Sequence, residues 1–280
     1  MKEKYGFIEF ENISEFRNWF NDLKITRKID GLQVHHMDLP SYDTWKNTDC
    51  KLWGEKNAPL NRTKSLDEYG KATWNYGDGH GHYIAQHLNV FPNGHITTGR
   101  DINSTPIGIK GWNKYKICVE IYGDFDVDVM TQEQKEAVIA IYAIMANRLN
   151  IPISSQGIRP HCWFTADGTY LGGYSSSKSA KTCPGKKFFG GNTKKSFDEN
   201  FYPLIKNYKY IEKQKYLRVL KAVNVHSSAD FKESSVCGKV EPGTVLTIID
   251  KVERSGTDMY LVKAGYYITA STKYVEVFEK

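Results

Sequence analysis

The chain has 280 residues, 40% hydrophobic and 25% charged, a composition typical of a globular protein with room for a large and a small domain. It contains no apolar run of about 18 residues, and its first residues are charged and amphipathic, which argues against a membrane-spanning helix and a secretory signal peptide. We therefore expect synthesis in the cytoplasm and no membrane insertion. The net charge of +6 suits a polyanionic partner, but the absence of a nucleic-acid-binding motif argues against nucleic acid.

The cysteines indicate reduced thiols. They are odd in number, widely spaced and without a CxxC pair, at Cys50, Cys118, Cys162, Cys183 and Cys237. A disulfide framework is therefore not expected.

The first hundred residues predict a helix, a strand and a hairpin. Residues 12–22 carry aromatic and aliphatic side chains at helical spacing after a capping Asn, and 31–37 form a short strand. Residues 38–79 are rich in tryptophan and turn-forming residues, so we expect a long functional loop there. The alternating runs 82–91 and 95–102 flank a Pro-Asn-Gly turn and predict a β-hairpin.

The next hundred residues continue the alternation of strand and helix. Residues 115–125 alternate between apolar and other side chains, which predicts a strand with two different faces. A Thr-x-x-Gln capping pattern opens a helix over 131–150, and 151–200 is loop-rich. The order of elements predicts an α/β catalytic domain over residues 1–208.

The last part of the chain has a different texture. After a polar linker at 209–215, residues 216–280 consist of short Val-, Ile-, Thr- and Tyr-rich runs separated by turn residues. This spacing predicts a small all-β barrel.

Four residues are candidate metal ligands. Hydrolytic zinc sites use three protein ligands, most often His and Cys, and leave one position open for water. His35 or His36, His161 and Cys183 could supply such a set, although their spacings form no local zinc motif. His35 and His36 are neighbours on a predicted strand, so only one of them can face a given site. Taken separately, each also fits a buried histidine or a packed thiol.

Glu120 is more informative because it interrupts an otherwise apolar strand. An ionised carboxylate that points inward is costly unless it has a partner or a catalytic role. A carboxylate beside a metal-activated water would have such a role.

At this point the sequence resembles a known family, the zinc-dependent N-acetylmuramoyl-L-alanine amidases of phage endolysins, which are related to peptidoglycan-recognition proteins. The resemblance spans roughly residues 5 to 200 and implies a mixed central sheet flanked by helices. It rests on six segments in this order: QVHHM, HYIAQHLNVFPNGHITTGR, IKGWNKYKICVEIYGDFD, MTQEQ, RPHCWF and KTCPG.

The resemblance implies a role for each of five residues. His35, His161 and Cys183 would bind Zn²⁺, and Glu120 would act as the general base. Lys181 would stabilise the oxyanion. The cleaved bond would join the lactyl group of N-acetylmuramic acid to L-alanine.

The sequence departs from the family at one position. Many members carry a tyrosine near the metal, and here Gln86 stands in its place, followed by His87. Either Glu120 is the base alone, or Gln86 and His87 position the substrate; His87 could equally be an ordinary strand histidine. Trp112 and Asn113, with the aromatic loop, would wall a groove for glycan and peptide, or serve in packing.

The C-terminal segment is similar to the bacterial SH3-type domains appended to cell-wall hydrolases, which implies peptidoglycan binding; a purely structural barrel is the alternative. The whole chain then resembles an endolysin or autolysin that acts on the bacterial cell wall after release and lyses the cell. Two other readings stay open, a non-catalytic peptidoglycan-binding protein and a zinc peptidase of the stem peptide. The presence of Cys183 favours catalysis over mere binding.

Overall fold

The computed structural model describes residues 1–49, 58–209 and 215–279. Contacts divide the chain into two compact units, Met1–Tyr210 and Ile211–Lys280. The predicted linker at 209–215 lies almost entirely outside the described residues, so its conformation stays a prediction.

The first unit is built on a seven-stranded mixed sheet of order β1-β2-β5-β4-β6-β3-β7. The pairs β4-β6, β6-β3 and β3-β7 are parallel. The pairs β1-β2, β2-β5 and β5-β4 are antiparallel. The strands are β1 (Lys2–Lys4), β2 (Phe7–Phe10), β3 (Gly31–His36), β4 (Leu88–Val90), β5 (Ile96–Thr98), β6 (Lys116–Ile121) and β7 (Ile158–Pro160). The expected mixed sheet and hairpin are both confirmed.

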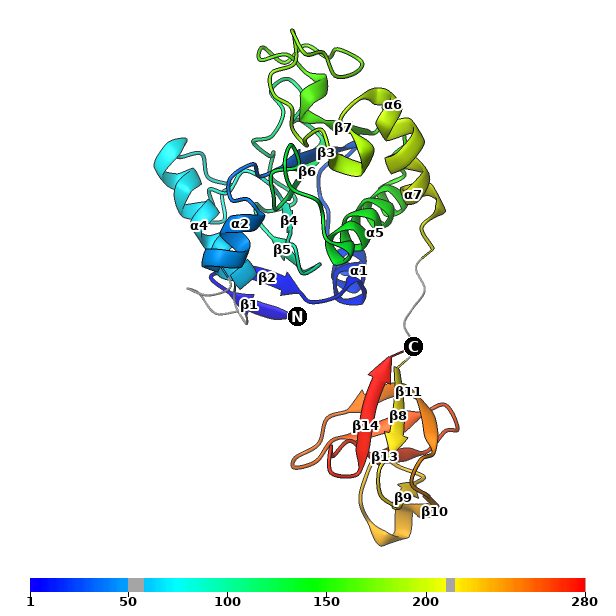
Figure 1. Cartoon of the computed structure of the whole chain (residues 1–280). Helices are drawn as coiled ribbons and strands as arrows, with labels where there is room; N and C mark the ends of the chain where they lie inside the picture. Colours follow the sequence, from blue (N-terminus) through cyan, green and yellow to red (C-terminus); the bar gives the residue numbers. More distant parts are fainter. Residues whose placement is uncertain (50–57, 210–214, 280) are drawn as a thin grey trace. The chain divides into compact units, whose positions relative to one another are not determined.

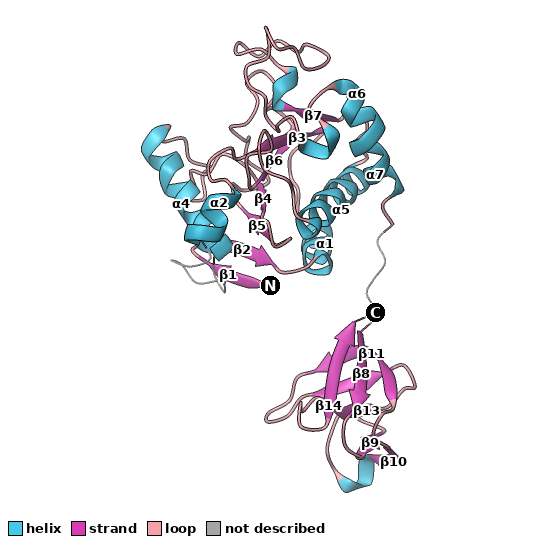
Figure 2. Cartoon of the chain, viewed as in Figure 1, coloured by secondary structure: helices cyan, strands magenta, loops and turns pink. Residues whose placement is uncertain are grey.

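Helices cover both faces of this sheet. In Figures 1 and 2, α2 and α4 lie on one side of the strands and α1, α5 and α7 on the other. The α-helices are α1 (Ile13–Asp22), α2 (Tyr42–Thr44), α4 (Ala58–Thr73), α5 (Gln132–Leu149), α6 (Lys194–Ser196) and α7 (Tyr202–Asn207). Single turns of other helix types span Trp45–Asp49, His161–Trp163, Phe188–Gly190 and Phe197–Phe201.

The helices predicted at 12–22 and 131–150 are both present with their caps. The Asn12 side chain accepts a hydrogen bond from the Glu15 N–H at 3.0 Å, and Thr131 Oγ1 accepts one from the Gln134 N–H at 3.2 Å. These bonds satisfy N–H groups that the first helical turn leaves without a partner. The caps explain why α1 and α5 begin where the sequence predicts.

The segment 38–79 differs from the expected long loop. It contains α2, the π-type turn Trp45–Asp49 and the 16-residue helix α4. The sequence of α4 has no continuous apolar stripe, because the helix buries little beyond its first turns, where Leu60 packs with Phe7 and Ile84. A helix with so narrow an apolar face escapes a periodicity argument. Trp53, part of the expected aromatic loop, lies outside the described residues.

Strand alternation separates the main core from the opposite face of the sheet. Leu32 and Val34 of β3 point into the large hydrophobic core beneath α1 and α5. Because successive side chains of a strand point to opposite faces, Gln33 and His35 face the other way. The same alternation places Cys118 and Glu120 of β6 on that second face.

The second unit is an all-antiparallel sheet of order β10-β9-β13-β12-β11-β8-β14 around its own small core. The all-β prediction is confirmed. Its strands are β8 (Lys215–Val219), β9 (Val223–His226), β10 (Val236–Val240), β11 (Val245–Val252), β12 (Met259–Val262), β13 (Tyr267–Thr269) and β14 (Val275–Glu279). Among the described residues of both units, no helix has the length and apolar character needed to cross a membrane.

Candidate active site

The parallel pairing of β3 with β6 brings His35 beside Glu120. The two residues are direct register partners, so their side chains leave the sheet on the same face. Ile117, Val119 and Ile121 of β6 face the core, which leaves Glu120 to face the site. The register therefore aims the strand's one carboxylate toward the first candidate ligand.

His161 and Cys183 reach the same place from β7 and the loop that follows it. β7 pairs with β3, and His161 comes directly after the last strand residue, Pro160. The Cys162 N–H donates to the carbonyl oxygen of Cys183 at 2.8 Å, which fixes the loop carrying Cys183 against the turn carrying His161.

His35, His161 and Cys183 form a group able to hold a metal ion, with one donor atom from each lying within 4.8 Å of the others. His35 Nδ1 lies 3.7 Å from Cys183 Sγ, and the two imidazole rings meet edge to face at 4.9 Å between centroids. The His36 N–H points at Cys183 Sγ from 3.3 Å, a contact that favours a thiolate.

Burial controls the ionisation of these ligands. It lowers the pKa of His35 well below its ordinary value, with His161 adding a smaller effect. Burial and then Lys181 lower the pKa of His161 to about 4. Both imidazoles are therefore neutral near pH 7, the form that ligates metals. Burial also raises the pKa of the Cys183 thiol, so a cation is needed to hold its thiolate.

A cavity of about 520 Å³ contains these ligands together with Glu120 and Lys181. Burial raises the pKa of Glu120 to about 7, and the Lys181 ammonium opposes that rise. Trp74, which follows α4, lies on the cavity wall and is 38% exposed. Trp45, by contrast, packs on Phe91 and Tyr122.

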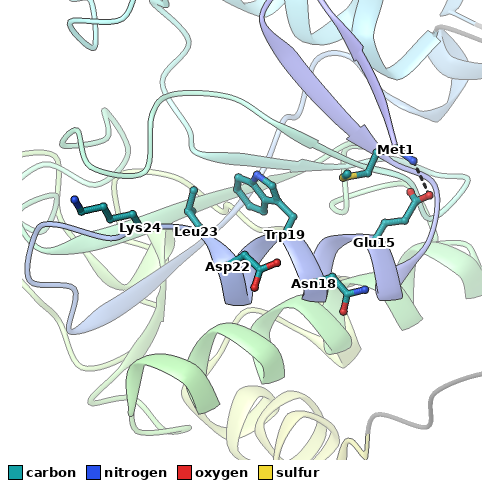
Figure 3. Close-up of a pocket in the computed structure, with 7 residues that line it drawn as sticks. All are labelled: Met1, Glu15, Asn18, Trp19, Asp22, Leu23 and Lys24. Carbon is teal, nitrogen blue, oxygen red and sulfur yellow. Dashed lines mark hydrogen bonds and ion pairs between the residues drawn. The ribbon is translucent and has the colours of Figure 1, made fainter. Parts of the chain in front are cut away.

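A second cavity of similar volume, about 550 Å³, lies along α1 (Figure 3). It shares no lining residue with the active-site cavity. Its lining contains no histidine or cysteine, and it includes Trp19 and Leu23. An ion pair of 2.6 Å joins the amino group of Met1 to Glu15 at one end. The residue types of this groove provide no ligand set for a metal.

Gln86 and His87 are not brought into the active-site cavity. Both are buried, and Gln86 donates a side-chain hydrogen bond to Asn89. His87 Nδ1 accepts from the Cys118 N–H at 2.9 Å, and its Nε2 lies 3.0 Å from the Ser104 carbonyl oxygen. The His87 ring thus links the backbone of Cys118 to that of Ser104. Contact of Gln86 and His87 with substrate stays a prediction, and their burial outside the cavity does not favour it.

Trp112 and Asn113 also lie outside the cavity lining. The Trp112 ring stacks on Phe164 at 5.6 Å, which is a packing contact. Asn113 Oδ1 accepts from the Gly108 N–H and from the side chain of Gln33, both at 3.0 Å. Their contact with substrate stays a prediction as well.

Gln33 is a residue near the site that the sequence did not single out. Its Oε1 lies 3.2 Å from His35 Nε2, and its Nε2 lies 2.6 Å from the Trp112 carbonyl oxygen. The sequence does contain a signal for this contact: Gln33 lies two positions before His35 on a predicted strand, so the two side chains point to the same face.

A second group, His36 with Asp124 and Asp126, also has donor atoms close together. Its atoms are largely engaged in hydrogen bonds: His36 Nδ1 accepts from the Phe125 N–H at 3.1 Å, and Asp126 accepts from the Thr182 hydroxyl. We assign no metal to this group.

The other cysteines that the structure describes lie outside the ligand group. Cys118 and Cys162 are buried free thiols, and Cys237 is an exposed one. Cys162, the neighbour of His161, directs its Sγ to the Asn192 carbonyl oxygen at 3.4 Å. Cys50 lies outside the described residues.

Comparison with known proteins identifies two regions. Residues 25–186 match the family model described as N-acetylmuramoyl-L-alanine amidase. Residues 208–275 match a model described as a domain of unknown function, DUF5776, so the match does not identify the second unit as an SH3 domain.

Among curated proteins, the chain is 36% identical over 76 residues to an L-alanyl-D-glutamate peptidase of Listeria phage A118. That match spans 26% of this chain and about a quarter (27%) of the relative's length.

Solved structures give weaker likenesses. The amidase LysC from Clostridium intestinale URNW is 19% identical, with a TM-score of 0.38 over 57% of this chain and 79% of that one. Drosophila PGRP-LB is 13% identical, with a TM-score of 0.42 over 59% and 79%. The amidase model, in contrast, matches more than half of the sequence. The chain therefore belongs to the N-acetylmuramoyl-L-alanine amidase family.

Proposed function

We propose that this chain is a zinc hydrolase that cleaves the amide bond between N-acetylmuramic acid and L-alanine in peptidoglycan. One observation carries the proposal: His35, His161 and Cys183 converge in one cavity with Glu120 and Lys181. The family membership supplies the substrate class.

The donor set fits zinc. Two neutral imidazoles and a thiolate are ligands that Zn²⁺ prefers, and three protein ligands leave a fourth position open, as in hydrolytic sites. The N–H of His36 beside Cys183 Sγ supports the thiolate form. Bound there, Zn²⁺ would lower the pKa of a coordinated water toward about 7 and polarise the substrate carbonyl.

Glu120 is proposed as the general base. Its position beside His35 lets it accept a proton from the attacking water and return it to the leaving amine of L-alanine. A pKa near 7 suits both halves of this task, because the group must gain and lose a proton at neutral pH.

Lys181 is proposed to stabilise the negative charge that develops on the carbonyl oxygen. It lines the cavity two residues before Cys183, and its charge is felt at His161 and Glu120. A fixed cation at such a point stabilises the transition state more than the substrate.

A defined muramyl-peptide tests the proposal. We expect release of a peptide with N-terminal alanine, loss of that release when zinc is chelated, and recovery when zinc is added back. Cys183→Ser and His35→Ala should both lose stoichiometric zinc and activity. Normal zinc content and cleavage in these two variants would overturn the ligand assignment.

Cleavage within the stem peptide is the second candidate, favoured by the short match to an L-alanyl-D-glutamate peptidase. The same zinc chemistry would serve either bond, since both are amides whose own carbonyl group can be polarised. A product with N-terminal glutamate instead of alanine would identify this activity.

We further propose that the second unit is an SH3-like module that binds peptidoglycan and that the protein acts on the wall as an endolysin. A surface cavity of about 370 Å³ on this unit includes Tyr274 and Phe231, which is 50% exposed. Such a second contact would raise the enzyme's concentration on the wall. Sedimentation of the inactive full-length Glu120→Gln protein with purified walls should weaken when Phe231→Ala is added; unchanged sedimentation would remove this cavity from the proposal.

A further inference from the structure

The strand that carries His35 also carries a buried glutamine whose side chain contacts the imidazole. Gln33 is 0% exposed and points to the same face of β3 as His35. Its Oε1 lies 3.2 Å from His35 Nε2 and accepts from the Ile109 N–H at 3.3 Å. Its Nε2 donates to the Trp112 carbonyl oxygen at 2.6 Å and to Asn113 Oδ1 at 3.0 Å.

These partners determine which end of the amide faces His35. The Trp112 carbonyl can only accept a hydrogen bond, so the NH₂ end of Gln33 must face it. The Ile109 N–H can only donate, so the other end must be the oxygen. Two independent backbone groups therefore fix the orientation of the Gln33 amide.

The orientation of Gln33 in turn fixes the tautomer of His35. Gln33 Oε1 is an acceptor, so the hydrogen bond of 3.2 Å requires the proton on His35 Nε2. Nδ1 then carries the lone pair, and this is the nitrogen that lies 3.7 Å from Cys183 Sγ. The free ligand atom consequently points toward the other donors of the site.

Close packing holds Gln33 in this orientation. A Cβ atom added at Gly108 would lie 1.9 Å from Gln33 Oε1, so the backbone approaches the amide as only glycine allows. Asn113 Oδ1, which accepts from Gln33, also accepts from the Gly108 N–H. The segment 108–113 thus wraps the amide from two sides.

We propose that Gln33 is a positioning residue: it holds the His35 tautomer that presents Nδ1 to the metal, and it links this ligand to the segment 108–113. The inference rests on the proposed zinc site. Groups that orient a ligating histidine through its other nitrogen typically alter metal affinity by about 10- to 100-fold when they are removed.

Zinc affinity is the first test, measured by competition with a chromophoric chelator on the full-length protein. Gln33→Met keeps the side-chain volume but removes the acceptor, so we expect zinc to bind about 10- to 100-fold more weakly. Gln33→Glu retains an oxygen facing His35, and we expect affinity closer to that of the unmodified protein even though the two hydrogen bonds that Gln33 donates, to the Trp112 carbonyl oxygen and to Asn113 Oδ1, are lost.

Gln134→Met provides a matched control for general destabilisation. Gln134 is also 0% exposed and donates to two backbone carbonyls, of Val90 and Tyr122, each at 2.9 Å. It has no hydrogen bond to a candidate ligand among the described residues. We expect lower stability with unchanged zinc affinity; an equal loss of affinity in both Met variants would show that Gln33 acts only through stability.

A second readout needs no variant at Gln33. In protein labelled with ¹⁵N-histidine, the His35 signal is assigned without zinc by its loss in His35→Gln and is then followed as zinc is added to the unmodified protein. The zinc-loaded signal should show the proton on Nε2 and the metal on Nδ1. The reverse pattern would overturn the inference even if Gln33→Met does not fold. Unmodified protein that binds no zinc would contradict the proposed function, whereas normal zinc binding with the reverse tautomer would contradict this inference alone.

Discussion

Glu120 is the residue whose replacement separates the chemistry from metal binding. It shares the cavity with the ligands but does not belong to the ligand group. For Glu120→Gln we expect a loss of about 10²- to 10⁴-fold in activity, the usual contribution of a general base, with stoichiometric zinc retained. Wall-suspension turbidity and bound-zinc analysis measure the two quantities, and near-normal lysis would remove Glu120 from the mechanism.

His87 predicts a pH dependence of stability. Burial, reinforced by Arg27, lowers its pKa to about 3, whereas an unfolded chain has a histidine pKa of about 6.5. Between these values the unfolded state binds the additional proton, so the free energy of unfolding decreases as the pH falls from about 6.5 toward 3. At pH 5 the loss from His87 is about 2 kcal/mol.

Urea unfolding at pH 7 and pH 5 checks this difference. In His87→Gln the drop between the two pH values should be smaller than in the unmodified protein by about 2 kcal/mol. The other buried histidines titrate in both proteins, so the comparison isolates His87. Equal drops would mean that the folded protein protonates this ring as easily as the unfolded chain does.

The start of α5 gives a prediction for a single element. Thr131 Oγ1 accepts from the Gln134 N–H and donates to the Pro92 carbonyl oxygen at 2.5 Å, so it joins the helix to the hairpin turn. Thr131→Ala should lower the free energy of unfolding by about 1 to 2 kcal/mol. Asn12→Ala at α1 removes a cap without such a second bond and should cost less; the opposite order would contradict the role of the Pro92 contact.

How well an element could be predicted depended on how much of it faces the core. α5 opens with a capping pattern and continues as a long, largely apolar run, and β6 alternates, so both elements were visible in the sequence. α4 buries few side chains, and its sequence gave no such signal. Residue types alone offered His35 or His36, and the choice of the ligand set rested on a family resemblance, because His161 lies 126 positions after His35 and no local spacing joins them.

The role of Gln33 was beyond the reach of the sequence for a related reason. Its partners Ile109, Trp112 and Asn113 lie 76 to 80 positions away, and the fold alone brings them together. Conversely, Gln86 stands at a family position and His87 follows it, yet the segment that leads into β4 buries both side chains. The sequence therefore indicated which segments contribute to the site. The register of β3 and β6 was needed to show which of their side chains share a face.

At the scale of the molecule, two separate units predict two separate unfolding transitions. Zinc would bind the folded first unit alone, so zinc at about 100 times its dissociation constant should stabilise that unit by about 2.7 kcal/mol. For a unit of this size, the midpoint should rise by about 5 to 10 °C.

Differential scanning calorimetry with and without a chelator measures the effect. The transition of the second unit should not move, which makes it an internal control. A zinc-dependent shift of both transitions, or of neither, would contradict a single metal site within the first unit.

The central claim concerns one bond, and mass spectrometry of digested cell walls tests it most directly. We predict new peptides with N-terminal L-alanine, together with glycan strands whose muramic acids carry free lactyl carboxyl groups, and neither product with Cys183→Ser. New N-terminal glutamate, other new amines or new reducing sugars without these products would contradict the amidase account.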